Sequence, residues 1–219
     1  MNAYFISGIA ADRRLFRRNQ LPDDYDPFYL DWIQPVQNET LSDYARRLAG
    51  NINQNKPFIL IGTSLGGIMA VEIALKYHAQ AVIIIGSVSL HTQLPKYFRM
   101  AGLLKIHKLV PGNIFKYSAI AKHYFSPEDA EDKQVIIRMI KETDPGFIKW
   151  GMNAVLTWKN HRSPKNLYHI HGTRDEMFPY SLTSPTHTIS KGDHIIVISK
   201  ADEVNSIIRE ILLNKGKFL

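Results

Sequence analysis

The residues best suited to chemistry lie in a Gly-x-Ser-x-Gly pentapeptide, Gly62 to Gly66, with Ser64 at its centre. The aliphatic run from Phe58 to Ile61 precedes it and predicts a fully buried parallel strand. Apolar residues at helical spacing from Gly67 to Leu75 predict an amphipathic helix after it. A strand, a tight turn, a serine and a helix in this order form a nucleophile elbow, which strains the serine backbone and exposes its hydroxyl. The pattern therefore predicts Ser64 as a nucleophile.

A serine hydroxyl is a weak nucleophile at neutral pH, so Ser64 needs a base and a carboxylate that orients the base. With a nucleophile elbow, the expected chain order is Ser, then Asp or Glu, then His. Asp175 follows a predicted strand, and His194 lies in the loop after the last predicted strand. Both loops are expected at the sheet edge that carries Ser64. We therefore predict Ser64, His194 and Asp175 as a catalytic triad.

Other histidines and carboxylates compete for the roles of base and acid. His171 ends a strand and is expected to face the interior, whereas His187 falls inside the short last strand. Asp193 is disfavoured as the acid because adjacent residues cannot easily aim their side chains at each other, here at His194. Asp144 lies in a predicted insertion, away from the strand ends. These alternatives rank below His194 and Asp175 but stay open.

Two backbone N–H groups are predicted to form an oxyanion hole. Attack on a carbonyl places negative charge on its oxygen, and each N–H donor can stabilise that charge by about 3 kcal/mol. Leu65 directly follows the nucleophile at a helix N-terminus and supplies one donor. Ile9 follows the first strand and is the predicted second donor, with Gly8 allowing close approach of the backbone.

Composition narrows the classes of protein to consider. The chain has 219 residues, 45% of them hydrophobic and none of them cysteine, which excludes disulfides, thiolate metal sites and a cysteine nucleophile. No apolar run reaches the roughly 20 residues that span a bilayer, so we expect no stable membrane insertion. The N-terminus predicts a first strand rather than a signal peptide, and the expected location is cytoplasmic.

The net charge of +7 is unevenly distributed along the chain. The segment from His91 to Phe125 contains no Asp or Glu, and its basic residues are Lys96, Arg99, Lys105, Lys108, Lys116 and Lys122. No nucleic-acid motif accompanies them, and interleaved apolar residues indicate amphipathic helices. A solvated basic face is the simplest interpretation, with attraction of an anionic substrate or a membrane surface as alternatives.

Strands and helices alternate in a pattern typical of an α/β fold with a mostly parallel sheet of about six strands and helices on both faces. The predicted strands are 4–7, 27–31, 58–61, 81–86, 166–171 and 186–189. The predicted helices of the core are 40–53, 67–75 and 201–213. The core therefore comprises residues 1–88 and 165–219.

The remaining segment, residues 89–164, is too long for a connection and predicts a helical cap inserted after a sheet strand. Helices are expected around 130–143 and 145–158. A cap at this position lies over the carboxyl ends of the strands, where open α/β sheets bind ligands. Its aromatic residues either line a pocket or pack within the cap: Phe98, Phe115, Phe125, Trp150 and Trp158.

These motifs together resemble those of a small α/β-hydrolase. The resemblance rests on the elbow Gly62–Gly67, the late segments His171–Asp175 and Gly192–His194, and the opening strand, and it covers the chain apart from the cap. Residues Ile6–Phe16 resemble the N-terminus of little-characterised bacterial members. The resemblance implies a Ser-His-Asp triad at Ser64, His194 and Asp175, no cofactor, and hydrolysis of an ester or similar acyl bond.

The chain departs from the pattern of that family at three places. Many members carry His-Gly-x-x-Gly at the oxyanion loop, whereas Ser7 replaces the histidine and Ala11 the second glycine. A glycine often precedes the catalytic histidine, but here it is Asp193. The two strands that open larger members are missing, because Tyr4 begins almost at the terminus.

The sequence favours a serine hydrolase that cleaves a small-molecule ester or thioester through an acyl-enzyme on Ser64. The expected partner is a small acyl substrate. The basic cap favours a substrate that carries an anionic group, and no nucleic acid is expected. Acyl transfer or lyase chemistry on the same triad is the alternative within this fold. A non-catalytic ligand-binding protein and a protein that binds membrane or nucleic-acid surfaces are alternatives from other classes. Substrate identity and oligomeric state stay open.

Overall fold

A computed structural model describes residues 1–104, 111–124 and 129–215. Its centre is a six-stranded sheet in the order β2-β1-β3-β4-β5-β6, and every strand pairs in parallel with its neighbours. The strands are β1 Asn2–Ile6, β2 Asp26–Tyr29, β3 Phe58–Thr63, β4 Ala81–Ile85, β5 Leu167–Gly172 and β6 His187–Ile189. The predicted α/β class and six-stranded sheet are confirmed, with strand ends shifted by one or two residues.

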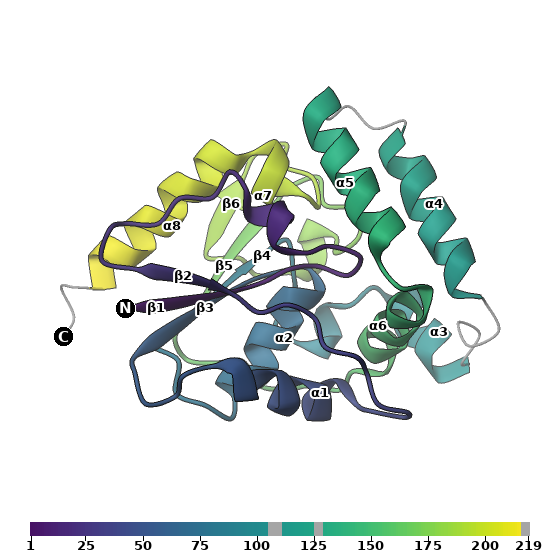
Figure 1. The fold of residues 1–219 in the computed structure, drawn as a ribbon, viewed down its shortest axis with the longest axis horizontal. Helices are drawn as coiled ribbons and strands as arrows, with labels where there is room; N and C mark the ends of the chain where they lie inside the picture. Colours follow the sequence, from purple (N-terminus) through teal and green to yellow (C-terminus); the bar gives the residue numbers. More distant parts are fainter. Residues whose placement is uncertain (105–110, 125–128, 216–219) are drawn as a thin grey trace.

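Helices cover both faces of this sheet (Figure 1). The helices of the core are α1 Leu41–Leu48, α2 Leu65–Ala74, α7 Ile196–Ser199 and α8 Ala201–Lys215. Alternate residues of the central strands point to opposite faces, so Leu60 packs with α1 and α2 whereas Ile59 and Ile61 pack with α8. Both faces are therefore buried, which explains the uninterrupted aliphatic runs of β3 and β4.

Among the described residues, four α-helices lie between β4 and β5: α3 Lys96–Leu104, α4 Gly112–Tyr124, α5 Ala130–Glu142 and α6 Pro145–Thr157. Side chains of α5 and α6 enter the hydrophobic clusters of the sheet, among them Met139 and Phe147. Ion pairs also join α5 to the short 3-10 helix η1, Arg13–Phe16, and the residue after it: Arg14 pairs with Glu142, and Arg17 pairs with Asp132. The four helices are thus anchored to the core, and the division into a core and a cap at residues 89–164 stays a prediction.

Helix α2 differs from its predicted form. It begins at Leu65 rather than Gly67, and all residues from Leu65 to Ile73 are buried, so it is not amphipathic. Its charged residue, Glu72, accepts a 2.8 Å hydrogen bond from Nε1 of Trp158, which follows α6. Helix α2 is therefore enclosed by the sheet, by α1 and by the segment after α6.

The strand order brings the loops that follow β1, β3, β4, β5 and β6 to one edge of the sheet. All strands run parallel, so their carboxyl ends share that edge, where open α/β sheets bind ligands. Within the described residues, no helix has both the length and the apolar character needed to cross a bilayer.

Candidate active site

Ser64 lies in a sharp turn between β3 and α2. Its φ of 52° and ψ of −122° are unusual for a residue with a side chain, so the surrounding structure must hold the backbone there. Neither flanking position has room for a side chain. A Cβ at Gly62 would lie 2.2 Å from the carbonyl oxygen of Gly66. A Cβ at Gly66 would lie 2.1 Å from the carbonyl oxygen of Ile6. The turn therefore packs directly on β1.

Three predicted residues meet at this edge of the sheet. Nε2 of His194 lies 3.0 Å from Oγ of Ser64, and Nδ1 of His194 lies 2.9 Å from Oδ2 of Asp175. An ionised carboxylate can only accept hydrogen bonds, so Nδ1 of His194 carries the proton. Nε2 is then free to accept the proton of the Ser64 hydroxyl. The His194 side chain is 20% exposed and that of Asp175 is fully buried. This arrangement can remove a proton from Ser64.

Asp175 is held by several hydrogen bonds. Its Oδ1 accepts from the backbone N–H groups of Met177 and Phe178 at 2.9 and 2.8 Å. Burial raises the pKa of the Asp175 carboxyl, but the hydrogen bond and charge of His194, with the N–H of Phe178 and the nearby His171, lower it overall. Asp175 is therefore ionised at neutral pH in a fixed orientation.

The residues that compete in the sequence have other contacts. Asp193 Oδ1 accepts from the Ile195 N–H and from Oγ of Ser199, and Asp144 caps α6 by accepting from the Phe147 N–H. His187 Nδ1 lies 2.8 Å from Oγ1 of Thr186. None of these contacts joins Ser64 or His194 through a side chain.

His171, which competes with His194 as the base in the sequence, is buried behind Asp175. Its Nε2 donates to the Phe178 carbonyl at 2.8 Å and lies 3.5 Å from Oδ2 of Asp175, and its Nδ1 is 3.0 Å from Nε2 of His169. Burial lowers the pKa of both histidines, that of His169 to about 3, where the neighbouring His171 adds to the effect. Both are neutral at pH 7 and help to fix the carboxylate.

Gly86 and Ser87 also support the turn, although sequence reasoning missed them. Gly86 has a φ of 51°, and a Cβ there would lie 2.7 Å from the carbonyl oxygen of His194. Ser87 Oγ donates to the carbonyl oxygen of Ser64 at 2.7 Å. Their position directly after β4, at the edge of the sheet that carries Ser64, is the sequence feature that could have identified them.

The loop after β1 lies beside Ser64. A Cβ at Gly8 would come 3.2 Å from Cβ of Ser64. The Gly8 carbonyl oxygen accepts from the Ala11 N–H at 3.3 Å and from Nε1 of Trp32 at 3.2 Å, and Ser7 Oγ donates to the Ala11 carbonyl at 2.8 Å. The two departures from the family pattern, Ser7 and Ala11, thus bond to each other and close the loop.

The backbone N–H groups of Ile9 and Leu65 stay available. Across the described ranges, neither donates to another group of the chain. Leu65 is the first residue of α2, where N–H groups have no partner within the helix and the helix dipole favours negative charge. The geometry is compatible with the predicted oxyanion hole.

Comparison with solved structures identifies the fold. A hydrolase from Pseudomonas aeruginosa PA01 superposes with a TM-score of 0.77 at 13% identity, over 96% of this chain and 89% of that one. MenH from S. aureus gives a TM-score of 0.75 at 15% identity, over 99% and 94%. A thermophilic esterase from Thermogutta terrifontis, with malate bound, gives 0.69 at 17% identity, over 98% and 90%.

The chain has the α/β-hydrolase fold. No family model matches its sequence, and no curated protein matches it either. In this α/β-hydrolase fold, Ser64, Asp175 and His194 follow β3, β5 and β6 in turn, which is the chain order of an elbow-based triad.

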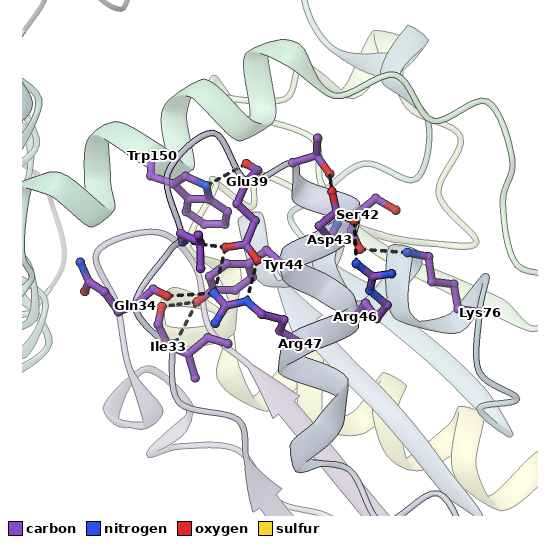
Figure 2. Close-up of polar contacts among 12 residues, drawn as sticks. Ile33, Gln34, Glu39, Ser42, Asp43, Tyr44, Arg46, Arg47, Lys76 and Trp150 are labelled. Atoms are coloured by element: carbon purple, nitrogen blue, oxygen red, sulfur yellow. Dashed lines mark hydrogen bonds and ion pairs between the residues drawn. The ribbon is translucent and has the colours of Figure 1, made fainter.

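Helix α6 lies over the proposed oxyanion residues. Gly151 of α6 is so close that a Cβ would come 2.7 Å from Cδ1 of Ile9 and 3.3 Å from Cδ2 of Leu65. Figure 2 shows how α6 is attached to α1 and the segment before it: Trp150 lies against Tyr44, with ring centroids 4.2 Å apart, and donates to the Glu39 carbonyl at 3.2 Å. Helix α6 is thus fixed directly above Ile9 and Leu65.

The aromatic residues named for a pocket have mixed placements. Trp158 is a core residue bound to Glu72 rather than a pocket residue, and Trp150 packs on Tyr44. Phe98 contacts Phe178, whose ring lies edge-on to His194 with centroids 5.4 Å apart. Phe125, with Lys105 and Lys108, lies outside the described residues, and nothing is described of the side chains of Phe115 and Lys122.

A cavity of about 330 Å³ lies beside β2, away from Ser64, and is lined partly by Tyr4, Phe28, Trp32 and Asn51. Trp32 connects this cavity to the loop after β1 through its bond to the Gly8 carbonyl oxygen. No group of three or more His, Asp or Glu side chains in ranges 1–104, 111–124 and 129–215 is arranged to hold a metal ion.

Proposed function

We propose that this protein is a serine hydrolase that cleaves an ester or thioester of a small molecule through an acyl-enzyme on Ser64. The proposal rests mainly on a continuous chain of hydrogen bonds. It runs from Ser64 Oγ to Nε2 of His194 at 3.0 Å, and from Nδ1 of His194 to the buried Asp175 carboxylate at 2.9 Å. A serine in a strained turn, a correctly oriented imidazole and an ionised carboxylate are what base-assisted attack on a carbonyl needs.

Acylation begins when Oγ of Ser64 attacks the carbonyl carbon and Nε2 of His194 takes the hydroxyl proton. Asp175 stays ionised and stabilises the resulting imidazolium through Nδ1. The N–H groups of Ile9 and Leu65 donate to the oxyanion of the tetrahedral intermediate, each contributing about 3 kcal/mol. The intermediate collapses as His194 passes its proton to the departing alcohol or thiol.

Deacylation repeats these steps with water as the nucleophile. His194 takes a proton from the water that attacks the acyl-enzyme, the same N–H groups hold the second oxyanion, and the proton returns to Oγ of Ser64. The products are a carboxylate and the alcohol or thiol released earlier. The residues involved need no redox or metal chemistry for this balance.

Similar structures support hydrolysis without fixing the substrate. Besides those above, a lipase-esterase related protein from Clostridium acetobutylicum and a lipase from Acinetobacter baumannii share the fold, at 18% and 16% identity. A bromoperoxidase from Bacillus anthracis shares it too, at 15% identity. Because one fold supports several activities, acyl transfer and lyase chemistry stay as alternatives.

The test is turnover of aryl esters and acyl thioesters of increasing chain length by wild-type protein and Ser64→Ala. Ser206→Ala, an exposed serine of α8, is the matched control. We expect Ser64→Ala to lose turnover and Ser206→Ala to keep it, with carboxylate and alcohol or thiol as products. Unchanged turnover in Ser64→Ala would overturn the proposal, and transfer to an added alcohol or amine in preference to water would favour acyl transfer.

A further inference from the structure

Helix α3 is apolar on two opposite faces. Its inner face packs on the protein: Phe98 contacts Phe178, and Gly102 lies so close to α6 that a Cβ would come 2.1 Å from the Leu156 carbonyl oxygen. Its outer face is exposed to solvent. The exposed fractions of the large apolar side chains on that outer face are 58% for Tyr97, 59% for Met100, 77% for Leu103 and 64% for Leu104.

A helix that is apolar all round is normally buried on every side. Soluble monomers rarely expose large contiguous apolar patches, and such patches mark interaction sites. Figure 1 shows α3 and α4 at the outer edge of the molecule, with α5 and α6 between them and the sheet. Helix α4 also exposes apolar side chains, Ile114 at 57% and Tyr117 at 67%. This end of the molecule therefore has the character of a docking surface.

The charge around α3 is positive. At 100° per residue, Lys96 lies on the outer face between Leu103 and Met100, and Arg99 borders that face. In the described part of the chain, neither has an ion pair with a carboxylate. Nε of Arg99 is buried and has no hydrogen-bond partner. Residues 91–127 contain no Asp or Glu. By contrast, Arg14 of η1 and Arg17, which directly follows η1, are paired with carboxylates of α5.

We propose that the outer face of α3, comprising Lys96, Tyr97, Met100, Leu103 and Leu104, docks on an anionic lipid surface. Aliphatic side chains of such a helix enter the boundary between headgroups and acyl chains while Lys and Arg meet the anionic headgroups. A nucleic acid would use the two cations but not the leucines. A second copy of the chain, paired through the same face, would bring like charges together.

This surface is close to the proposed active site. On the inner face of α3, Phe98 contacts Phe178 with ring centroids 6.5 Å apart, and Phe178 contacts His194 at 5.4 Å. Docking of α3 therefore places Ser64 near the lipid surface. The assignment of a substrate rests on the proposed function: the substrate is an acyl ester with an apolar chain, and the enzyme takes it from that lipid surface. Lipid docking itself requires no catalysis.

The experiment is flotation with vesicles of phosphatidylcholine alone and with about one third phosphatidylglycerol, at low and high salt. The test variant is Leu103→Glu with Leu104→Glu, and the matched control is Leu213→Glu, an exposed leucine of α8 that is 59% exposed. Lys96→Glu is paired with Lys56→Glu, an exposed lysine between η2, Ala49–Asn51, and β3. Ser64→Ala tests docking apart from catalysis.

We expect binding to anionic vesicles that salt weakens, a loss of about tenfold or more in both α3 variants, and wild-type binding in both controls and in Ser64→Ala. Absent binding, or equal losses in the α3 variants and their controls, overturns the proposal. Dependence on α3 for binding an oligonucleotide but not vesicles assigns the face to nucleic acid instead. Self-association abolished by Leu103→Glu with Leu104→Glu assigns it to a second copy. Failure of ester turnover with intact docking refutes only the proposed function.

Discussion

Trp32 offers a sharp test of how the oxyanion loop is held. Its Nε1 donates to the Gly8 carbonyl oxygen at 3.2 Å, and that carbonyl shares a peptide group with the N–H of Ile9, the proposed oxyanion donor. Trp32→Phe removes the donor, while the new ring can keep the contacts with Phe147 and Tyr44. The change therefore affects the orientation of one peptide more than the packing around it.

The expected size of the effect follows from the contacts that remain. The Ala11 N–H still holds the Gly8 carbonyl at 3.3 Å, so the variant loses about 1 kcal/mol of orienting interaction rather than the whole loop. That corresponds to a decrease of about fivefold in kcat. Complete loss of the Ile9 donor would cost about 3 kcal/mol, or about a hundredfold, which sets the upper bound. KM should change little, because the interaction acts on the transition state.

Trp158→Phe is the matched control for the same chemical change. It removes the 2.8 Å bond to Glu72 in the core and leaves that buried carboxyl without the indole donor. We expect it to lower the free energy of unfolding by about 1–3 kcal/mol with kcat unchanged. Ester kinetics and urea denaturation of both variants test the pair. Wild-type kcat in Trp32→Phe, or equal loss of kcat in both, would refute the role given to Gly8 and Ile9.

Asp175→Asn should lower kcat by about 10⁴-fold, because its amide favours the tautomer of His194 that carries the proton on Nε2; kinetics and nitrogen NMR of the imidazole check this. Burial lowers the pKa of His169 to about 3, so the unfolded chain takes up this proton first as the pH falls below 6.5. Stability should therefore decline from pH 6.5 toward 3, by at most about 1.4 kcal/mol per pH unit from this group, and His169→Gln should flatten urea midpoints measured against pH. Gly66→Ala should prevent soluble expression, whereas Gly50→Ala, with no atom within 4 Å of its added Cβ, should not.

The sequence predicted the centre of the sheet well because β1, β3 and β4 are buried on both faces. Aliphatic runs such as Val82 to Ile85 have few other interpretations in a chain of alternating elements. Helix α2 was harder: the spacing of its apolar residues indicated an amphipathic helix, but Trp158, distant in the sequence, covers the carboxyl of Glu72. A local pattern contains no information about a partner that lies 86 residues away in the sequence.

The residues of the candidate site also fall into those that the sequence could predict and those that it could not. Ser64, Asp175 and His194 could be selected because motif, chain order and strand ends restrict the choice. His171 and Trp32 could not, because their roles depend on tertiary contacts with Asp175 and Gly8. Ser7 and Ala11 looked like defects of a loop motif, and only the structure shows that they bond to each other.

The central claim is that Ser64 is a nucleophile activated by His194, and the most direct measurement is its covalent labelling. The protein is incubated with a fluorophosphonate probe, digested, and mapped by mass spectrometry, with Ser64→Ala and His194→Gln in parallel. We expect a single adduct on the peptide that contains Ser64, absent in Ser64→Ala and formed far more slowly in His194→Gln. An unlabelled Ser64, or labelling as fast in His194→Gln as in the wild type, would contradict it.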